Sequence, residues 1–208
     1  MGRRLFLVLA GALGLSVTLI TGATGAAFSS ATGNPGNTFT AAASFCGTQT
    51  VTASEDARVH QGNPASNYGN DPALQVRSAF LSNRRTLVTF ALPAIPPGCT
   101  LTSATLRLFA TSAAGGRTID VYRANAAWSE AAVTWVTQPG TTGPAVGAPS
   151  GSGWVQWNVT GHVSAMYAGS NFGFVVRDRT ENSFSSQQQN YRSSEAGQTS
   201  PELVVTFS

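Results

Sequence analysis

The sequence contains no lysine, so all twelve of its basic residues are arginines. Charged residues make up only 10% of the chain, and the formal net charge is +3. Arg3 and Arg4 precede an apolar run near the N-terminus, and without them ten arginines face nine acidic residues. So small a surplus gives no support for a nucleic-acid partner. A chain poor in charge and rich in Gly, Ser and Thr instead suits a β-rich extracellular surface.

Common catalytic motifs are also missing. The sequence has no Gly-x-Ser-x-Gly, no His-Glu-x-x-His, no phosphate-binding glycine loop and no Cys–His pairing. His162 lacks an obvious orienting carboxylate and is expected to be a surface or capping residue. The missing motifs do not exclude a glycosidase that uses two carboxylates, because its acids can be far apart in sequence. Glu130 would be the candidate acid of such an enzyme. An isolated carboxylate is rarely catalytic, so we predict a protein that is not an enzyme.

An export signal is predicted over residues 1–27. Arg3 and Arg4 are followed by an apolar run and then by the small residues Thr21 to Ala27. The run is shorter than the ~20 apolar residues of a spanning helix, which favours a cleaved signal over an uncleaved anchor. Residues 28–45 are predicted to be a flexible lead-in. Segments 26–30 and 36–42 resemble the leaders of camelysin-like bacterial surface and fibre proteins. This resemblance implies a secreted or cell-surface location.

Cys46 and Cys99 are the only cysteines. In an exported chain, a disulfide between them is the first expectation. It would constrain the unfolded chain by about 4 kcal/mol in the chain-entropy model. Two buried, unpaired thiols are the alternative. A zinc site is not expected, because the thiols and the two histidines lack the close spacing of zinc motifs.

From Cys46 onward, short runs alternate apolar and polar residues and are separated by Gly, Pro, Asn and Ser. This pattern is typical of antiparallel strands. It predicts an all-β domain over residues 46–208, an antiparallel two-sheet β-sandwich of jelly-roll type. The inward-facing series includes Phe172, Phe174 and Val176.

One segment breaks the β pattern. Val163, Met166 and Tyr167 recur at helical spacing within residues 160–169. We predict one short helix at an end of the sandwich, with Thr160 as a cap at its start and Gly169 at its end.

The stretch from Trp128 to Pro139 gathers two of the four tryptophans around Glu130. It has two interpretations: a platform that stacks on sugar rings, or an aromatic corner that closes one end of the sandwich. Trp128 and Trp135 are separated by an odd number of positions, so they would point to opposite faces of a single strand. The aromatic corner is therefore favoured.

Oxygen-bearing side chains are frequent between residues 55 and 71. Asp56, Asn67 and Asp71 are candidate ligands of a structural Ca²⁺, which takes six to eight oxygen ligands. The alternative is that these side chains satisfy backbone amides in turns, as Asx residues usually do. No other cofactor is expected.

A series of short motifs occurs in an order that is more specific than any one of them. The series is Glu55–Val59, Asn63–Gly69, Leu74–Arg77, Arg84–Phe90, Ile95–Gly98, Thr102–Leu108, Val121–Arg123, Trp128–Pro139, Val159–Thr160 and Asn171–Phe174. The whole resembles a DNRLRE domain, the group that includes carbohydrate-binding module family 96. The resemblance spans roughly residues 48–207 and implies a non-catalytic β-sandwich, with acidic polysaccharide such as alginate bound by some members. No lyase or hydrolase domain accompanies the module in this sequence.

An acidic glycan needs cations and flat apolar surface, and the planar fork of Arg matches a carboxylate. We therefore predict a polysaccharide or cell-wall glycan as partner, bound by a monomer, with no nucleic acid. The candidate ligand-binding residues are Arg77, Arg107, Arg123, Tyr122, Arg177 and Tyr191. For any single arginine, the alternative is a solvated strand face. The alternative function is a structural or adhesive surface module without specific glycan binding.

Overall fold

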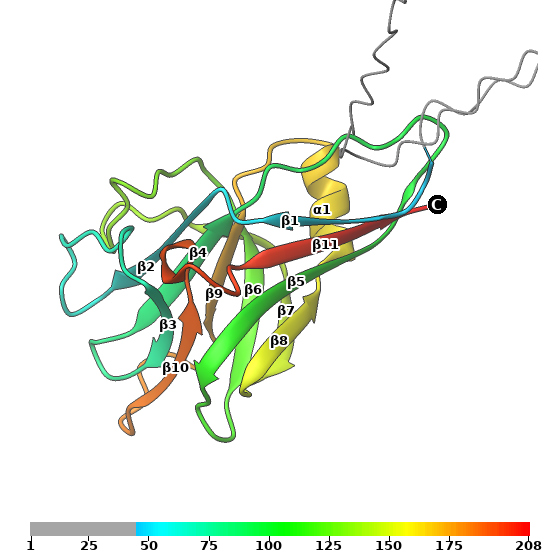
Figure 1. The fold of residues 1–208 in the computed structure, drawn as a ribbon. Coiled ribbons are helices and arrows are strands. Elements are labelled where there is room, and N and C mark those ends of the chain that lie inside the picture. Colours follow the sequence, from blue (N-terminus) through cyan, green and yellow to red (C-terminus); the bar gives the residue numbers. More distant parts are fainter. Residues whose placement is uncertain (1–44) are drawn as a thin grey trace, which may run out of the picture. The chain divides into compact units, whose positions relative to one another are not determined.

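The computed structural model describes residues 45–208; the predicted signal peptide and nearly all of the predicted lead-in lie outside the described residues. The described part, called the domain below, contains eleven strands, one α-helix and one 3-10 turn (Figure 1). The elements are β1 Thr48–Thr52, β2 Glu55–His60, β3 Ala73–Ser78, β4 Arg84–Thr89, β5 Leu101–Ser112, β6 Thr118–Ala124, β7 Thr141–Pro149, β8 Gly153–Asn158, α1 Thr160–Tyr167, β9 Phe174–Asp178, β10 Gln187–Arg192, η1 Ser194–Ala196 and β11 Glu202–Phe207.

All strand pairs in the domain are antiparallel, which confirms the predicted all-β class. One group runs β1-β11-β5-β10-β3, with β8 on the other edge of β5. A second group consists of β2, β4, β9, β6 and β7. A single bridge between Arg77 and Arg84 joins the groups into one continuous sheet. This curled sheet is consistent with a β-sandwich, while a two-sheet jelly roll stays a prediction.

The sheet curls around one main core. Trp157 on β8 donates its indole N–H to the carbonyl of Ile119 on β6, at 2.9 Å, although these strands are far apart in the strand order. The alternation of β5 and β11 supplies much of the core, since every second residue faces inward. Residues of α1, including Val163 and Met166, join the same cluster, as predicted for a helix that closes the domain.

Local details of two segments differ from the prediction. Thr160 does not cap α1 with its side chain; its hydroxyl instead accepts a hydrogen bond from the backbone N–H of Ala104. Phe172 does not share the face of Phe174, because Gly173 has a φ of +77° and turns the chain between them. A Cβ on Gly173 would overlap the carbonyl of Val88, so this turn requires glycine.

A second, smaller hydrophobic cluster lies on the opposite face of β2, β4 and β9. It contains Val59, Leu87 and Val175, and the segment from Trp128 to Trp135 packs over it. Trp128 also donates its indole N–H to the carbonyl of Phe172 at 2.9 Å. These contacts agree with the aromatic corner, and we call this side of the sheet the covered face.

The predicted disulfide between Cys46 and Cys99 is present, and the domain holds no free cysteine. It fastens the start of β1 to the loop before β5 across 53 residues of sequence. Within residues 45–208, no helix has the length and apolar character needed to cross a membrane.

Candidate functional site

The residues predicted to bind a ligand are distributed over several parts of the domain. Arg77 on β3 and Arg107 on β5 alternate with core residues, so both point outward from the first strand group. Tyr122 and Arg177 lie together on the covered face, where the guanidinium of Arg177 is 4.7 Å from the centre of the Tyr122 ring. The predicted ligand-binding residues therefore lie on more than one surface of the domain.

Tyr191 is a core residue, which corrects its assignment as a ligand-binding side chain. It is only 1% exposed, and its ring packs 6.3 Å from that of Trp157. Burial raises the pKa of its phenol well above the ordinary value. A side chain enclosed in this way has no surface to offer a polysaccharide.

Arg123 cannot join Tyr122 on one surface. Arg123 pairs with the core residue Phe174, whereas Tyr122 pairs with Val175, and successive strand residues point to opposite faces. Arg123 instead faces the region of His162, which is 3% exposed and so is not the predicted surface residue. Burial, followed by the charge of Arg123, lowers the pKa of His162.

A row of arginines follows the outward side of β8, β5, β10 and β3 and continues onto β4 and β2. Figure 1 shows β8, β5, β10 and β3 crossing the domain in this order. We call this surface the basic face. Its charged and aromatic members are Arg58, Tyr68, Asp71, Arg77, Arg84, Arg107, Phe109, Trp154, Arg192 and Glu202.

Aromatic rings and arginines interlock at the β8 end of the basic face. Phe109 pairs with Trp154 across β5 and β8, and their rings meet edge to face at 5.5 Å. The guanidinium of Arg107 lies 4.4 Å from the Trp154 ring, and that of Arg192 lies 5.1 Å from the Phe109 ring. These contacts hold the long side chains flat against the sheet, which lowers the entropy lost when they bind a ligand.

Neutral acceptors hold the arginines at the centre of the basic face. Arg84 donates to the side-chain oxygens of Gln75 at 2.5 Å and Gln188 at 3.0 Å. Arg77 donates to the hydroxyl of Ser186 at 3.0 Å. Arg192 similarly donates to Thr199 at 3.0 Å. None of these three arginines has an acidic partner within residues 45–208, so their positive charge is not neutralised.

The arginines of the basic face affect the pKa of His60 on β2. Burial lowers the pKa of His60, and the charges of Arg84, Arg77 and Arg58 lower it further. Burial also lowers the pKa of Arg84, with added repulsion from Arg77 and Arg58. Both shifts have burial as their main cause, and repulsion between neighbouring cations adds to it.

Tyr68 and Asp71 form the far end of the basic face. The guanidinium of Arg58 lies 4.3 Å from the Tyr68 ring centre and 2.7 Å from a carboxylate oxygen of Asp71. At the other end, Glu202 lies 3.5 Å from Arg107. Among the residues named above as members of this face, five arginines are therefore opposed by two acids, Asp71 and Glu202.

The covered face carries arginines that are neutralised by acids. Arg85 makes a bidentate pair with Glu181, with both N···O distances at 2.7 Å, and stacks 4.7 Å from the Trp135 ring. Arg177 shares the same Glu181 at 3.9 Å, and Arg179 pairs with Asp120 at 2.8 Å. Tyr122 and Arg177, both predicted as ligand contacts, thus belong to a surface whose charges are largely paired.

Two of the predicted calcium ligands, Asn67 and Asp71, have partners within the protein. Asn67 donates its amide to the carbonyls of Glu130 and Val133 and accepts from the backbone of Gly69. Asp71 pairs with Arg58 and accepts from the backbone N–H of Ala73. These are turn and ion-pair contacts, as in the alternative interpretation, whereas Asp56 lies in a different group of oxygens.

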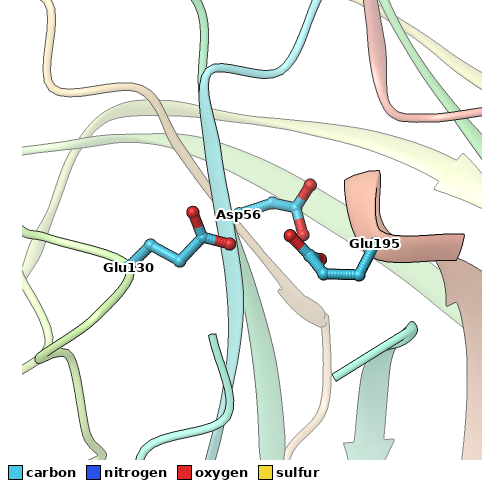
Figure 2. A group of neighbouring side chains, drawn as sticks. All are labelled: Asp56, Glu130 and Glu195. Carbon is cyan, nitrogen blue, oxygen red and sulfur yellow. The ribbon is translucent and has the colours of Figure 1, made fainter. Parts of the chain in front are cut away.

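Asp56, Glu130 and Glu195 form a cluster of three carboxylates, called the acid cluster below. Figure 2 shows their carboxyl groups pointing toward one another from β2, the loop after β6 and η1. One ligand oxygen from each residue lies within 4.8 Å of the other two. The sequence could not reveal this group, because the segments that supply it are far apart in the chain.

The members of the acid cluster differ in their ionisation. Burial, with a smaller contribution from Glu195, raises the pKa of Asp56 to about 6. Burial and the charges of Glu195 and Asp56 raise the pKa of Glu130 to about 7. Burial alone would raise the pKa of Glu195, but hydrogen bonds from its own backbone and from the hydroxyl of Ser194 hold it below its ordinary value.

Phe80 and Phe184 form an exposed aromatic pair. Phe80 is 55% exposed and Phe184 is 91% exposed, and their rings stack at 5.2 Å with an interplanar angle of 16°. They come from the loops after β3 and after β9. Sequence reasoning missed this pair, as well as Phe109 and Trp154. For the latter two, the alternation of β5 and β8 was a usable signal, since it places both outside the core.

Residues 47–207 match the family model described as carbohydrate-binding module family 96. No curated protein matches the chain. The family match covers most of the 208 residues, and it confirms the resemblance to carbohydrate-binding module family 96. The chain therefore belongs to carbohydrate-binding module family 96.

Proposed function

We propose that the protein is an exported, non-catalytic module that binds an acidic polysaccharide through the basic face. The observation that carries this proposal is the set of three arginines, Arg77, Arg84 and Arg192, that are held by neutral partners, with Arg192 also over the Phe109 ring. Uronate carboxylates along a polymer would accept paired hydrogen bonds from these guanidinium groups. Membership of a carbohydrate-binding family supports a glycan over other polyanions.

The length of the basic face supports a polymer rather than a single sugar. Its contacts run from Trp154 on β8 through Arg192 on β10 to Arg84 on β4 and Arg58 on β2. Several sugar units would thus contact the face at once, each with a modest contribution. Association would depend on ionic strength, because salt screens the interaction between exposed charges.

Affinity electrophoresis in gels that contain a soluble polymer tests the ligand class. We expect retardation by alginate and by polygalacturonate, weaker retardation by neutral β-glucan, and a loss of retardation as salt is added. A sulfated polymer separates general polyanion attraction from recognition of carboxylates, because only the latter needs the planar bidentate geometry. Equal retardation by neutral and acidic polymers, or none by either, would contradict the proposal.

A structural or adhesive role without specific glycan binding is the second candidate. The exposed Phe80 and Phe184 favour it, since aromatic side chains this exposed are typical of interaction surfaces. A Phe80→Ser, Phe184→Ser variant tests it through attachment of the protein to cells or fibres. Loss of attachment with unchanged polymer binding would support the adhesive role, and unchanged attachment would contradict it.

A further inference from the structure

The geometry of the acid cluster points to a second ligand: we infer that Asp56, Glu130 and Glu195 bind a calcium ion. The three side chains come from β2, the loop between β6 and β7, and η1. One ion would thereby connect three segments that hydrogen bonding between strands does not join directly. This inference concerns a metal site and does not depend on the proposed glycan.

The separation of the oxygens suits the size of calcium. Each carboxylate offers one oxygen within 4.8 Å of the other two. Calcium binds oxygen at about 2.3–2.6 Å, so ligands on opposite sides of the ion are about 4.6–5.2 Å apart. A single ion can therefore reach all three residues. An all-oxygen set of carboxylates selects a hard cation rather than a transition metal that prefers nitrogen or sulfur.

Asp56 provides a buried oxygen that lacks a protein partner. The residue is 0% exposed, and its Oδ2 accepts a hydrogen bond from the backbone N–H of Ser194 at 2.9 Å. Its Oδ1 has no hydrogen-bond partner within residues 45–208. A fully enclosed carboxylate oxygen without a partner is costly, and coordination of a cation removes that cost.

Two further polar atoms beside the acid cluster are also buried and have no hydrogen-bond partner within residues 45–208. Oε1 of Glu130 is buried and has no hydrogen-bond partner in the described part of the chain. The hydroxyl of Ser193, a residue that is 0% exposed and directly precedes η1, is also unpartnered there. Bidentate carboxylates together with this hydroxyl and water would reach the six to eight oxygens that calcium takes.

Protonation of the carboxylates is the competing explanation. The raised pKa values of Asp56 and Glu130 mean that, without a cation, the acid cluster holds protons near neutral pH. However, Glu195 keeps a lowered pKa and stays charged, and Asp56 with a pKa of about 6 is mostly ionised at pH 8. At that pH the buried charge of Asp56 lies beside the charged and exposed Glu195, and a calcium ion in the acid cluster would neutralise both.

The ion would also complete the charge pattern of the basic face. Asp56 and Arg58 lie on the same side of β2, and Glu195 follows Arg192 by a few residues in the chain. Three free carboxylates at this edge would repel an acidic polymer. With calcium bound, the edge would carry little negative charge, and the arginines would dominate the local field.

Calorimetric titration of the purified protein with CaCl₂ at pH 8, after removal of divalent ions by a chelator, tests the inference without any glycan. We expect one binding event and a rise in melting temperature of about 5–10 °C at a hundredfold excess over the dissociation constant. Tb³⁺ gives an independent readout, because Trp128 is two residues from Glu130 and can sensitise its emission.

Matched variants locate the ion. Asp56→Asn and Glu130→Gln keep the shape of each side chain and should reduce calcium affinity at least tenfold. Asp71→Asn is the control, because Asp71 carries the same charge on a neighbouring loop but pairs with Arg58. Absence of heat, of a thermal shift and of Tb³⁺ emission would overturn the inference. So would a loss of binding in Asp71→Asn with retention in Glu130→Gln.

Discussion

On the covered face, Arg85 meets both oxygens of Glu181 at 2.7 Å, whereas on the basic face Arg84 donates to the neutral amide oxygens of Gln75 and Gln188. Both arrangements fix the position of a guanidinium group. Only the second leaves its charge available, because a neutral acceptor orients the cation without neutralising it. Two neighbouring arginines of one strand, Arg84 and Arg85, thus have opposite roles because strand geometry sends them to opposite faces.

The tryptophans of the two faces differ in the groups that they pack against. Trp135 lies over the second hydrophobic cluster and stacks on an arginine that is already paired with Glu181. Trp154 lies outside the main core on β8 and contacts Arg107 and Phe109 at the end of the basic face. We infer that the first tryptophan stabilises the fold and that the second contributes to ligand binding.

The largest expected effect separates these two tryptophans. Trp135→Ala should destabilise the domain by about 3 kcal/mol, the lower end of the range for truncated core aromatics, because its side chain is half-buried. Trp154→Ala should cost little stability but reduce binding to an acidic polymer by about tenfold, or 1.4 kcal/mol. Chemical denaturation and affinity electrophoresis of both variants measure the two effects. Loss of polymer binding in Trp135→Ala with unchanged stability would contradict the structural role of Trp135.

A pH titration of stability tests the acid cluster at the edge of the basic face. The folded pKa values of Asp56 and Glu130, about 6 and about 7, lie above their ordinary values. The folded state therefore holds protons that the unfolded chain releases, and the stability that they contribute is complete below about pH 4. In chelator, this contribution should disappear as the pH rises through 6 and 7.

Melting curves in chelator between pH 4 and pH 8 provide the measurement. The Asp56→Asn, Glu130→Gln double variant should lose less stability over this interval, since neither side chain can ionise. If the double variant and the unmodified protein decline equally, the two carboxylates are not the source of the pH dependence. Calcium should reduce the decline only in the unmodified protein.

The smallest expected effect is a change in the titration of His60. Arg84→Gln should raise the pKa of His60, because it removes the nearest of the positive charges that oppose protonation. Arg177→Gln, on the covered face, should leave it unchanged. The protein has only two histidines, so proton NMR resolves both, and His162 serves as an internal reference. An equal shift of His60 in both variants would contradict the separation of the faces.

Much of the fold could be predicted because it depends on the alternation of apolar and polar residues along each strand. The runs that form β5, β8 and β11 place apolar residues at every second position, and these residues are buried. The pairing of Cys46 with Cys99 needed only the cysteine count and the expectation of export. The family resemblance likewise depended on motifs that are contiguous in sequence.

The positions of the candidate binding residues were harder to predict, because polar strands do not show which of their residues face the core. β10 reads Gln-Gln-Gln-Asn-Tyr-Arg, and apolar alternation does not show which of its residues face inward. Its pairing with β3 and β5 decides this, and places Tyr191 in the core and Arg192 outside. In contrast, the strand period alone could have separated Tyr122 from Arg123, since they are adjacent on β6.

The acid cluster lay beyond any sequence argument. Asp56 was identified as a calcium candidate, but Glu130 and Glu195, which are far from it in the sequence, were not chosen as its partners. Gly69 explains part of this arrangement: a side chain there would overlap the carbonyl of Glu130, so the loop before β3 and the Trp128–Pro139 segment fit closely together. Such contacts depend on the finished fold.

Affinity for alginate in the triple variant Arg77→Gln, Arg84→Gln, Arg192→Gln, compared with the double variant Arg85→Gln, Arg177→Gln, tests the central claim most directly. We expect the triple variant to lose at least a hundredfold in affinity at low ionic strength, with about 1.5–3 kcal/mol for each charged hydrogen bond lost. Its remaining binding should hardly depend on salt. The double variant should bind as the unmodified protein does once it is confirmed to be folded. Equal affinities in the triple variant and the unmodified protein, or a greater loss in the folded double variant, would contradict the assignment of the basic face.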